Sequence, residues 1–226
     1  DPVSGTVKIG DTDLKKVRLA DLRKKVVRVA QFPLFVADTV RANFQLAKAD
    51  ATDAEIEEVC NATGLWDVLT IASPDAPLDT ILPRDVAQGL SGGQRRLLAV
   101  SRALLLKPSV LLLDEPSAGL DNLTLQKLIR FLKTQTSGLT VLVIDHDLEG
   151  FVAKIADKIA ILEHGKIALS GTHEELMKTD NLYRRLVEAP QKEEVAPEPK
   201  IAPMLDGMML AEADLPMMGE IDMPMM

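Results

Sequence analysis

Hydrophobic and polar residues follow patterns that switch repeatedly between strand-like and helix-like spacing along the chain. Apolar or alternating runs rich in β-branched residues predict strands at 4–9, 26–30, 110–113 and 139–144, and a hairpin of 157–162 with 166–170. Helical spacing predicts helices over 13–25, 39–46, 53–63, 92–106 and 121–133, and two short helices within 171–189. The alternation predicts an α/β fold with a mostly parallel sheet flanked by helices.

Polar residues follow three of these strands directly. Gln31 follows the second strand, the pair Asp114 and Glu115 follows the third, and His146 lies just after the fourth. Ligands of open α/β sheets bind at the carboxyl ends of the strands. One of the two carboxylates can hold Mg²⁺ and the other can position or deprotonate a water molecule, as phosphoryl transfer requires.

Two tight loops open predicted helices. Leu90-Ser91-Gly92-Gly93-Gln94 leads into the helix over 92–106, and the loop 117–121, which ends in Asp121, leads into the next one. A helix N-terminus presents free N–H groups and the positive end of the helix dipole, so both loops suit an anion. The nearby Arg95, Arg96 and Arg102 are interpreted as surface or interface charges on a solvated helix face, with a phosphate clamp as the alternative.

Composition narrows the class of protein. Apolar residues make up 46% of the chain, which fits a globular protein, and the net charge of −8 argues against nucleic-acid binding. The single cysteine, Cys60, excludes an internal disulfide. The segment 190–226 holds eight acidic residues, six prolines and eight of the nine methionines, which predicts a disordered tail. A short partner-binding or membrane-touching segment and a Cu(I) site made of methionines are the alternatives for this tail.

Together, LSGGQ, VLLLDE and SAGLD resemble the signature, Walker B and D-loop motifs of ATP-binding cassette (ABC) ATPases. The stretch VRVAQFPLFVADTVRAN resembles the Q-loop and the start of the ABC helical subdomain, and His146 resembles the switch histidine. The resemblance implies a P-loop NTPase-type sheet over residues 1–189, with a helical subdomain at about 38–107.

The same resemblance assigns roles and partners. Glu115 and His146 would be catalytic, Asp114 and Gln31 would hold Mg²⁺, and the residues that contact ATP would be Gln31, Ser91, Gly92, Gly93, Gln94 and Asp121. A second nucleotide-binding domain and a transmembrane domain are the implied partners. The last part of the fold is similar to that of exporters, which implies a location at the cytoplasmic face of the inner membrane.

One family element is missing from the sequence. No G-x-x-x-x-G-K-[ST] phosphate loop occurs in the 226 residues. By resemblance, the chain matches the rear two-thirds of a nucleotide-binding domain, and the first strands and phosphate loop are expected upstream of Asp1. We therefore expect the chain alone neither to bind ATP tightly nor to hydrolyse it. If it folds alone, we expect it to oligomerise or rearrange, because an apolar sheet edge is exposed.

The sequence departs from the family pattern at two places, and two alternative functions remain. Asp145 stands where the family commonly has Thr or Ser, and the loop LPRDVAQG before the signature is one residue longer than in exporters. A soluble, non-transport ABC ATPase is disfavoured by the acidic charge and the absence of long heptad repeats. A non-catalytic partner domain is disfavoured by the intact Glu115 and His146.

Overall fold

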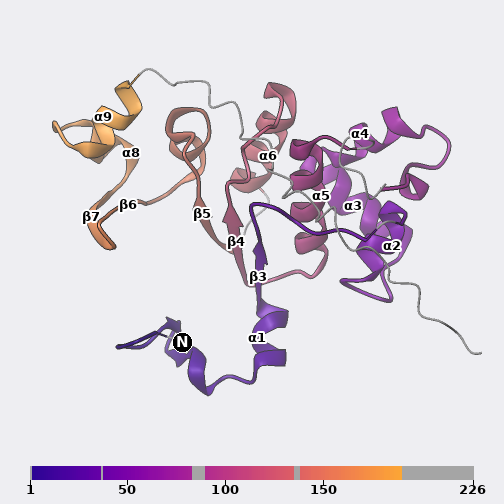
Figure 1. Cartoon of the computed structure of the whole chain (residues 1–226), viewed down its shortest axis with the longest axis horizontal. Coiled ribbons are helices and arrows are strands. Elements are labelled where there is room, and N and C mark those ends of the chain that lie inside the picture. Colours follow the sequence, from indigo (N-terminus) through magenta and orange to yellow (C-terminus); the bar gives the residue numbers. More distant parts are fainter. Residues whose placement is uncertain (1, 37, 83–89, 135–137, 190–226) are drawn as a thin grey trace, which may run out of the picture. The chain divides into compact units, whose positions relative to one another are not determined.

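The computed structural model describes residues 2–36, 38–82, 90–134 and 138–189 (Figure 1). The tail 190–226 and almost all of the loop LPRDVAQG lie outside these described residues. Contacts divide the chain into the units Asp1–Ala189 and Pro190–Met226. The expected helical subdomain and disordered tail stay predictions.

A three-stranded parallel sheet, in the order β3-β4-β5, is the centre of the first unit (Figure 1). Its strands are β3 (Val26–Val29), β4 (Val110–Asp114) and β5 (Thr140–Ile144), which confirms the three strands predicted in these regions. The register pairs Val29 with Leu113, and Leu113 with Val143. The strands therefore end together, and the residues that follow them meet at one edge.

Two long helices cover one face of this sheet. α5 (Gly92–Leu105) and α6 (Asn122–Thr134) share a core with the alternate residues Leu111 and Leu113 of β4. Burying apolar side chains on one face is the main stabilising term for such a layer. On the opposite face Leu142 and Ile144 of β5 stay 59% and 63% exposed.

The N-terminal region differs from its prediction. The expected strand over 4–9 is only β1 (Lys8–Ile9), paired antiparallel with β2 (Thr12–Asp13). The expected single helix over 13–25 is two pieces, the 3₁₀ turn η1 (Leu14–Lys16) and α1 (Leu19–Lys25). The bond from Val17 N–H to Leu14 O ends the 3₁₀ turn at Val17. The backbone of Val17 and Arg18 is extended, and this interrupts the helix between η1 and α1.

A second core is formed by helices α2 (Val40–Gln45), α3 (Asp53–Thr63) and α4 (Leu65–Ala72), together with part of α5. A capping box of Thr52 and Glu55 begins α3, and Gly64, with φ of 84°, ends it. Both features match the predicted bounds of this helix. α4 was not predicted, nor was the 3₁₀ turn η2 (Pro77–Asp79).

The C-terminal elements follow the prediction more closely. After a π-helical turn η3 (Leu148–Val152) and the short α7 (Ala153–Ile155), neither of them predicted, β6 (Ile159–Glu163) and β7 (Lys166–Gly171) form the expected antiparallel hairpin. The two expected short helices are α8 (His173–Met177) and α9 (Leu182–Glu188). No helix within the described ranges has the length and apolar character that crossing a bilayer requires.

Candidate functional site

The side chains that follow β3 and β4 are in direct contact. Gln31 Nε2 donates a hydrogen bond of 2.6 Å to Glu115 Oε2, across 84 positions of sequence. The parallel pairing of β3 with β4 causes this contact, because it brings both strand ends to one edge. The amide of Gln31 uses its N–H group here, so its carbonyl oxygen is the atom that could ligate a metal.

The backbone of Glu115 is in an unusual conformation. Its φ is 47°, in the left-handed region that residues with a Cβ rarely occupy. Its N–H donates to Ile144 O over 2.7 Å, which ties the residue to the end of β5. Residues in this region cost about 1–3 kcal/mol and cluster at functional sites.

His146 lies on the other side of the same carboxylate. Its Nδ1 is 4.0 Å from Glu115 Oε1, and its side chain is 60% exposed while that of Glu115 is 29% exposed. This distance is longer than a hydrogen bond, so the imidazole is near the carboxylate but is not bonded to it. Gln31, Glu115 and His146 thus come together at the ends of three adjacent strands.

Asp114 has a partner that the sequence did not suggest. Arg28 Nη2 donates to Asp114 Oδ2 over 3.0 Å. Arg28 pairs in register with Leu112, two residues before Asp114, so both side chains lie on the same face of the sheet. The alternation Val27-Arg28-Val29 indicates that Arg28 lies on the opposite face of the strand from its two apolar neighbours. This pattern was the signal in the sequence that could have pointed to Arg28.

The turn Ser91–Gln94 is built as a helix start. Ser91 Oγ accepts from Gln94 N over 3.2 Å, and Gln94 Oε1 accepts from Ser91 N over 2.9 Å, a reciprocal capping box. The N–H groups of Gly92 and Gly93 lie between these two at the positive end of α5. The turn therefore keeps two backbone donors at a helix N-terminus, where an anion is stabilised.

The loop 117–121 packs against this turn. A Cβ placed at Gly93 would overlap Gly119 O, so the two backbones touch where only glycine fits. Arg96 Nη1 donates to Ala118 O, while its Nε is buried with no partner among the described residues. This contact corrects the interpretation of Arg96 as a solvated charge. Asp121 starts α6 by accepting from Thr124 Oγ1 (2.6 Å) and Thr124 N (3.0 Å), which lowers the pKa of its carboxyl.

The predicted residues therefore form two groups. Gln31, Glu115 and His146 make one, with Asp114 adjacent to Glu115 in the chain. Ser91–Gln94 make the other, with the loop that ends at Asp121 packed against them. Within the part of the chain that the structure describes, no hydrogen bond or ion pair joins Ser91–Gln94 to Gln31, Asp114, Glu115 or His146. The two groups are instead connected through the loop 117–121, since Ala118 N donates to Glu115 O over 3.4 Å and Gly119 meets Gly93.

Comparison with known proteins decides the family. The sequence profile described as "ABC transporter" matches residues 1–118. The chain belongs to the ABC transporter family. This family binds ATP, generally with Mg²⁺.

Two relatives and one solved structure show the extent of the match. The "ATP-dependent lipid A-core flippase" of Burkholderia pseudomallei is 38% identical over 82% of this chain, and "ABC transporter ATM1" of Toxoplasma gondii is 35% identical over 86%. These matches cover 30% and 17% of the two relatives, so the chain spans less than a third of the length of either. A structure titled a "bacterial Atm1-family ABC exporter with ATP bound" superposes with a TM-score of 0.75 at 28% identity. It covers 82% of this chain and 32% of the exporter, which confirms the predicted α/β fold.

The chemistry of the first group fits the Mg²⁺ that this family generally uses. Among the described residues, no cluster of three or more His, Cys, Asp and Glu side chains could hold a metal. Mg²⁺ seldom needs such a cluster, because it takes one or two carboxylates from the protein and its other ligands from phosphates and water. Asp114 and the carbonyl oxygen of Gln31 are hard oxygen donors of this kind. Bound there, Mg²⁺ would neutralise charge on the phosphates.

Arg102 of α5 is a second arginine whose environment differs from the prediction. Its guanidinium lies 4.8 Å from the centroid of the Phe35 ring, and Nη2 donates to Leu34 O over 3.2 Å. Burial lowers the pKa of Arg102, as expected for a charge taken out of water. Arg102 therefore holds the segment after Gln31 against α5.

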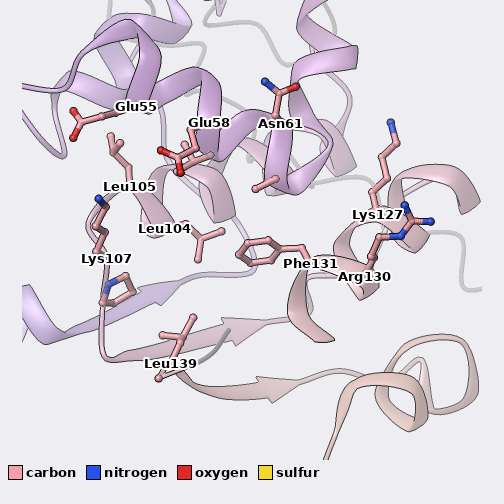
Figure 2. Close-up of a pocket in the computed structure, with 14 residues that line it drawn as sticks. Glu55, Glu58, Asn61, Leu104, Leu105, Lys107, Lys127, Arg130, Phe131 and Leu139 are labelled. Atoms are coloured by element: carbon pink, nitrogen blue, oxygen red, sulfur yellow. The ribbon is translucent and has the colours of Figure 1, made fainter. Parts of the chain in front are cut away.

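A cavity of about 920 Å³ lies elsewhere in the first unit (Figure 2). Its apolar floor includes Leu104, Phe131 and Leu139, and its rim carries charges of both signs, such as Glu58 and Lys107 (Figure 2). None of the residues predicted to bind ATP or Mg²⁺ lines it. We therefore place the candidate ATP chemistry at the strand ends rather than in this cavity.

Proposed function

We propose that this chain supplies the ATP-hydrolysing part of an ABC exporter, located at the cytoplasmic face of the inner membrane. The observation that carries the proposal is the convergence of Gln31, Glu115 and His146, with the hydrogen bond of 2.6 Å from Gln31 to Glu115. A carboxylate fixed by an amide and flanked by an imidazole is suited to orient and deprotonate a water molecule.

Each residue of this group has a distinct role in the proposal. Glu115 accepts the proton of the attacking water, and Gln31 fixes the direction of that carboxylate. His146, largely exposed, contacts the γ-phosphate of ATP from the opposite side. Asp114 and Gln31 hold Mg²⁺, and binding the metal requires Asp114 to exchange its ion pair with Arg28.

The second group serves another nucleotide. We infer that Ser91, Gly92, Gly93 and Gln94 hold the γ-phosphate of ATP bound to a second nucleotide-binding domain, and that Asp121 lies at the same interface. The support is the exposure of Ser91 and Gly92 at the start of α5 and, among the described residues, the absence of a hydrogen bond from Ser91–Gln94 to Gln31, Glu115 or His146. No phosphate loop occurs in the 226 residues, so the β- and γ-phosphates need residues from outside this sequence. ATP then closes the dimer, and hydrolysis reopens it.

The transmembrane domain is proposed to bind beside the Q-loop. Phe32 and Leu34 are 77% and 87% exposed directly after Gln31, and Val36 is also exposed. Adjacent exposed apolar side chains are typical of a protein interface. A partner that moves this segment would move Gln31, and this gives a route from hydrolysis to substrate movement.

A chimeric transporter tests the function. In it, residues 4–189 of this chain replace the matching residues of the Burkholderia pseudomallei flippase, whose upstream residues stay in place. We expect the chimera to hydrolyse ATP. Glu115→Gln should lower kcat by about 10²- to 10⁴-fold, since it removes the proton acceptor.

Glu163→Gln, at the end of β6, is the matched control and should leave the rate within about twofold, the usual range for a surface change of this kind. An unchanged rate in Glu115→Gln would contradict the assignment of the base. A folded, ATP-binding chimera that shows no hydrolysis would contradict the proposed function as a whole.

A further inference from the structure

One carboxylate joins the loops that follow β4 and β5. Asp145 Oδ1 accepts from Ser117 Oγ over 2.8 Å and from Asp147 N over 2.9 Å, and its Oδ2 accepts from Ser117 N over 3.1 Å. Ser117 is 28 positions away in the sequence. Asp145 thus fixes its own loop through Asp147 and a separate loop through Ser117.

These two loops carry the proposed catalytic groups. Glu115 lies two residues before Ser117, and His146 follows Asp145 directly. The left-handed backbone of Glu115 persists only if the chain is held on both sides of it. The bond from Glu115 N to Ile144 O holds it at the end of the strand, and the bonds from Ser117 to Asp145 hold it beyond.

We propose that Asp145 is a positioning residue, a clamp that sets how the Glu115 carboxylate faces the His146 imidazole. The clamp needs a carboxylate because three donors converge on it, and two oxygens with about four lone-pair sites can accept them all. A side chain with a single hydroxyl oxygen, such as that of Thr or Ser, could not accept from all three donors, because Asp145 receives them on two separate oxygens. Asp145 therefore makes this chain's pair of loops more rigid than a hydroxyl would.

Amide hydrogen exchange in the full chain tests the clamp without any hydrolysis. In Asp145→Ala the amides of Ser117 and Asp147 lose their acceptor, and the amide of Glu115 loses the restraint beyond it. We expect all three to exchange at least about tenfold faster than in the wild type, since one hydrogen bond to a charged group is worth about that factor. Asp145→Asn keeps one acceptor oxygen and should give intermediate rates.

Asp13→Ala is the matched control, because Asp13, at the junction of β2 and η1, also accepts from a backbone N–H, that of Lys15. It should speed exchange at Lys15 and leave Ser117, Asp147 and Glu115 unchanged. If Asp145→Ala speeds exchange at Asp147 alone, the carboxylate has only a local role and the clamp is overturned.

A second experiment, on ATP hydrolysis, distinguishes a positioning role of Asp145 from a purely structural one. This experiment rests on the proposed function. In the chimeric transporter, Asp145→Ala should lower kcat by about tenfold or more and leave KM for ATP within about twofold, with partial recovery in Asp145→Asn. A raised KM at unchanged kcat would overturn the positioning role. If the unmodified chimera hydrolyses no ATP, the proposed function fails, and the exchange rates still decide the clamp.

Discussion

At the scale of single residues, two glycines determine how closely the turn Ser91–Gln94 approaches the loop 117–121. Gly93 meets the carbonyl of Gly119, and Gly119 has φ of 72°, a conformation that side chains disfavour. The adjacent Gly92 has open space at the position of a Cβ. A side chain is therefore excluded sterically at Gly93 but not at Gly92, and an alanine substitution at each position can measure the difference.

Gly93→Ala should destabilise the chain by about 1–3 kcal/mol, because the new methyl group overlaps backbone rather than a flexible side chain. Urea unfolding of the full chain measures this change. Gly92→Ala is the control and should shift stability by no more than about 0.5 kcal/mol. Equal effects of the two substitutions would show that the turn and the loop 117–121 do not pack as described.

At the scale of elements, the segment after β3 is positioned by α5. Arg102 covers the Phe35 ring and donates to Leu34 O, and Val36 N donates to Asn43 Oδ1 over 3.0 Å. Leu34 itself remains exposed. The backbone of the segment is held while apolar side chains face outward, as a preformed docking surface requires.

Arg102→Ala should loosen this segment. We expect the bonded amides of Val36 and Asp38 to exchange about 3- to 30-fold faster, the range that follows from losing a cation–π contact and a hydrogen bond. Arg102→Lys should be intermediate, because lysine keeps the charge but not the planar guanidinium. Arg130→Ala, on the exposed side of α6, should leave these amides unchanged. No change in Arg102→Ala would mean that α5 does not hold the segment.

The elements that the sequence predicted correctly are those with a strong local signal. The capping box at Thr52 and the αL glycine Gly64 give the bounds of α3 without tertiary information. α4 was missed because it begins directly at Gly64, which sequence reasoning treats only as a helix end. The partners of Asp114 and Asp145 depend on strand register across 86 and 28 positions, which periodicity does not encode.

At the scale of the whole molecule, the described residues cover one face of the central sheet and leave the other open. Among the described residues β5 pairs only with β4, so its other edge is free, and its Leu142 and Ile144 are exposed. Unpaired N–H and C=O groups beside apolar side chains promote pairing with another chain. These features support the expectation that the chain on its own self-associates.

Light scattering of the full chain at increasing concentration measures this association. We expect a mass above that of the monomer for the wild type and a shift toward monomer for Leu142→Lys, which places a charge on the open face. Leu123→Lys, at the exposed start of α6, is the control and should associate as the wild type does. A monodisperse wild-type monomer would contradict the expectation.

In the proposed function the two groups of residues serve different nucleotides in a dimer, with Glu115 acting on its own subunit's ATP and Ser91 on its neighbour's. Its most direct test mixes two variants of the chimeric transporter, Ser91→Arg and Glu115→Gln, and isolates the mixed dimer with two affinity tags. Each variant alone should be nearly inactive, because both of its sites lack one essential residue.

In the mixed dimer, one site combines the intact Glu115 of one subunit with the intact Ser91 of the other. We predict that ATP hydrolysis returns to a substantial fraction of the wild-type rate, while the other site, which carries both substitutions, stays inactive. If Ser91 and Glu115 served the same subunit's nucleotide, each site would keep one substitution. Hydrolysis in the mixed dimer would then stay at the level of the two variants, which would contradict the account.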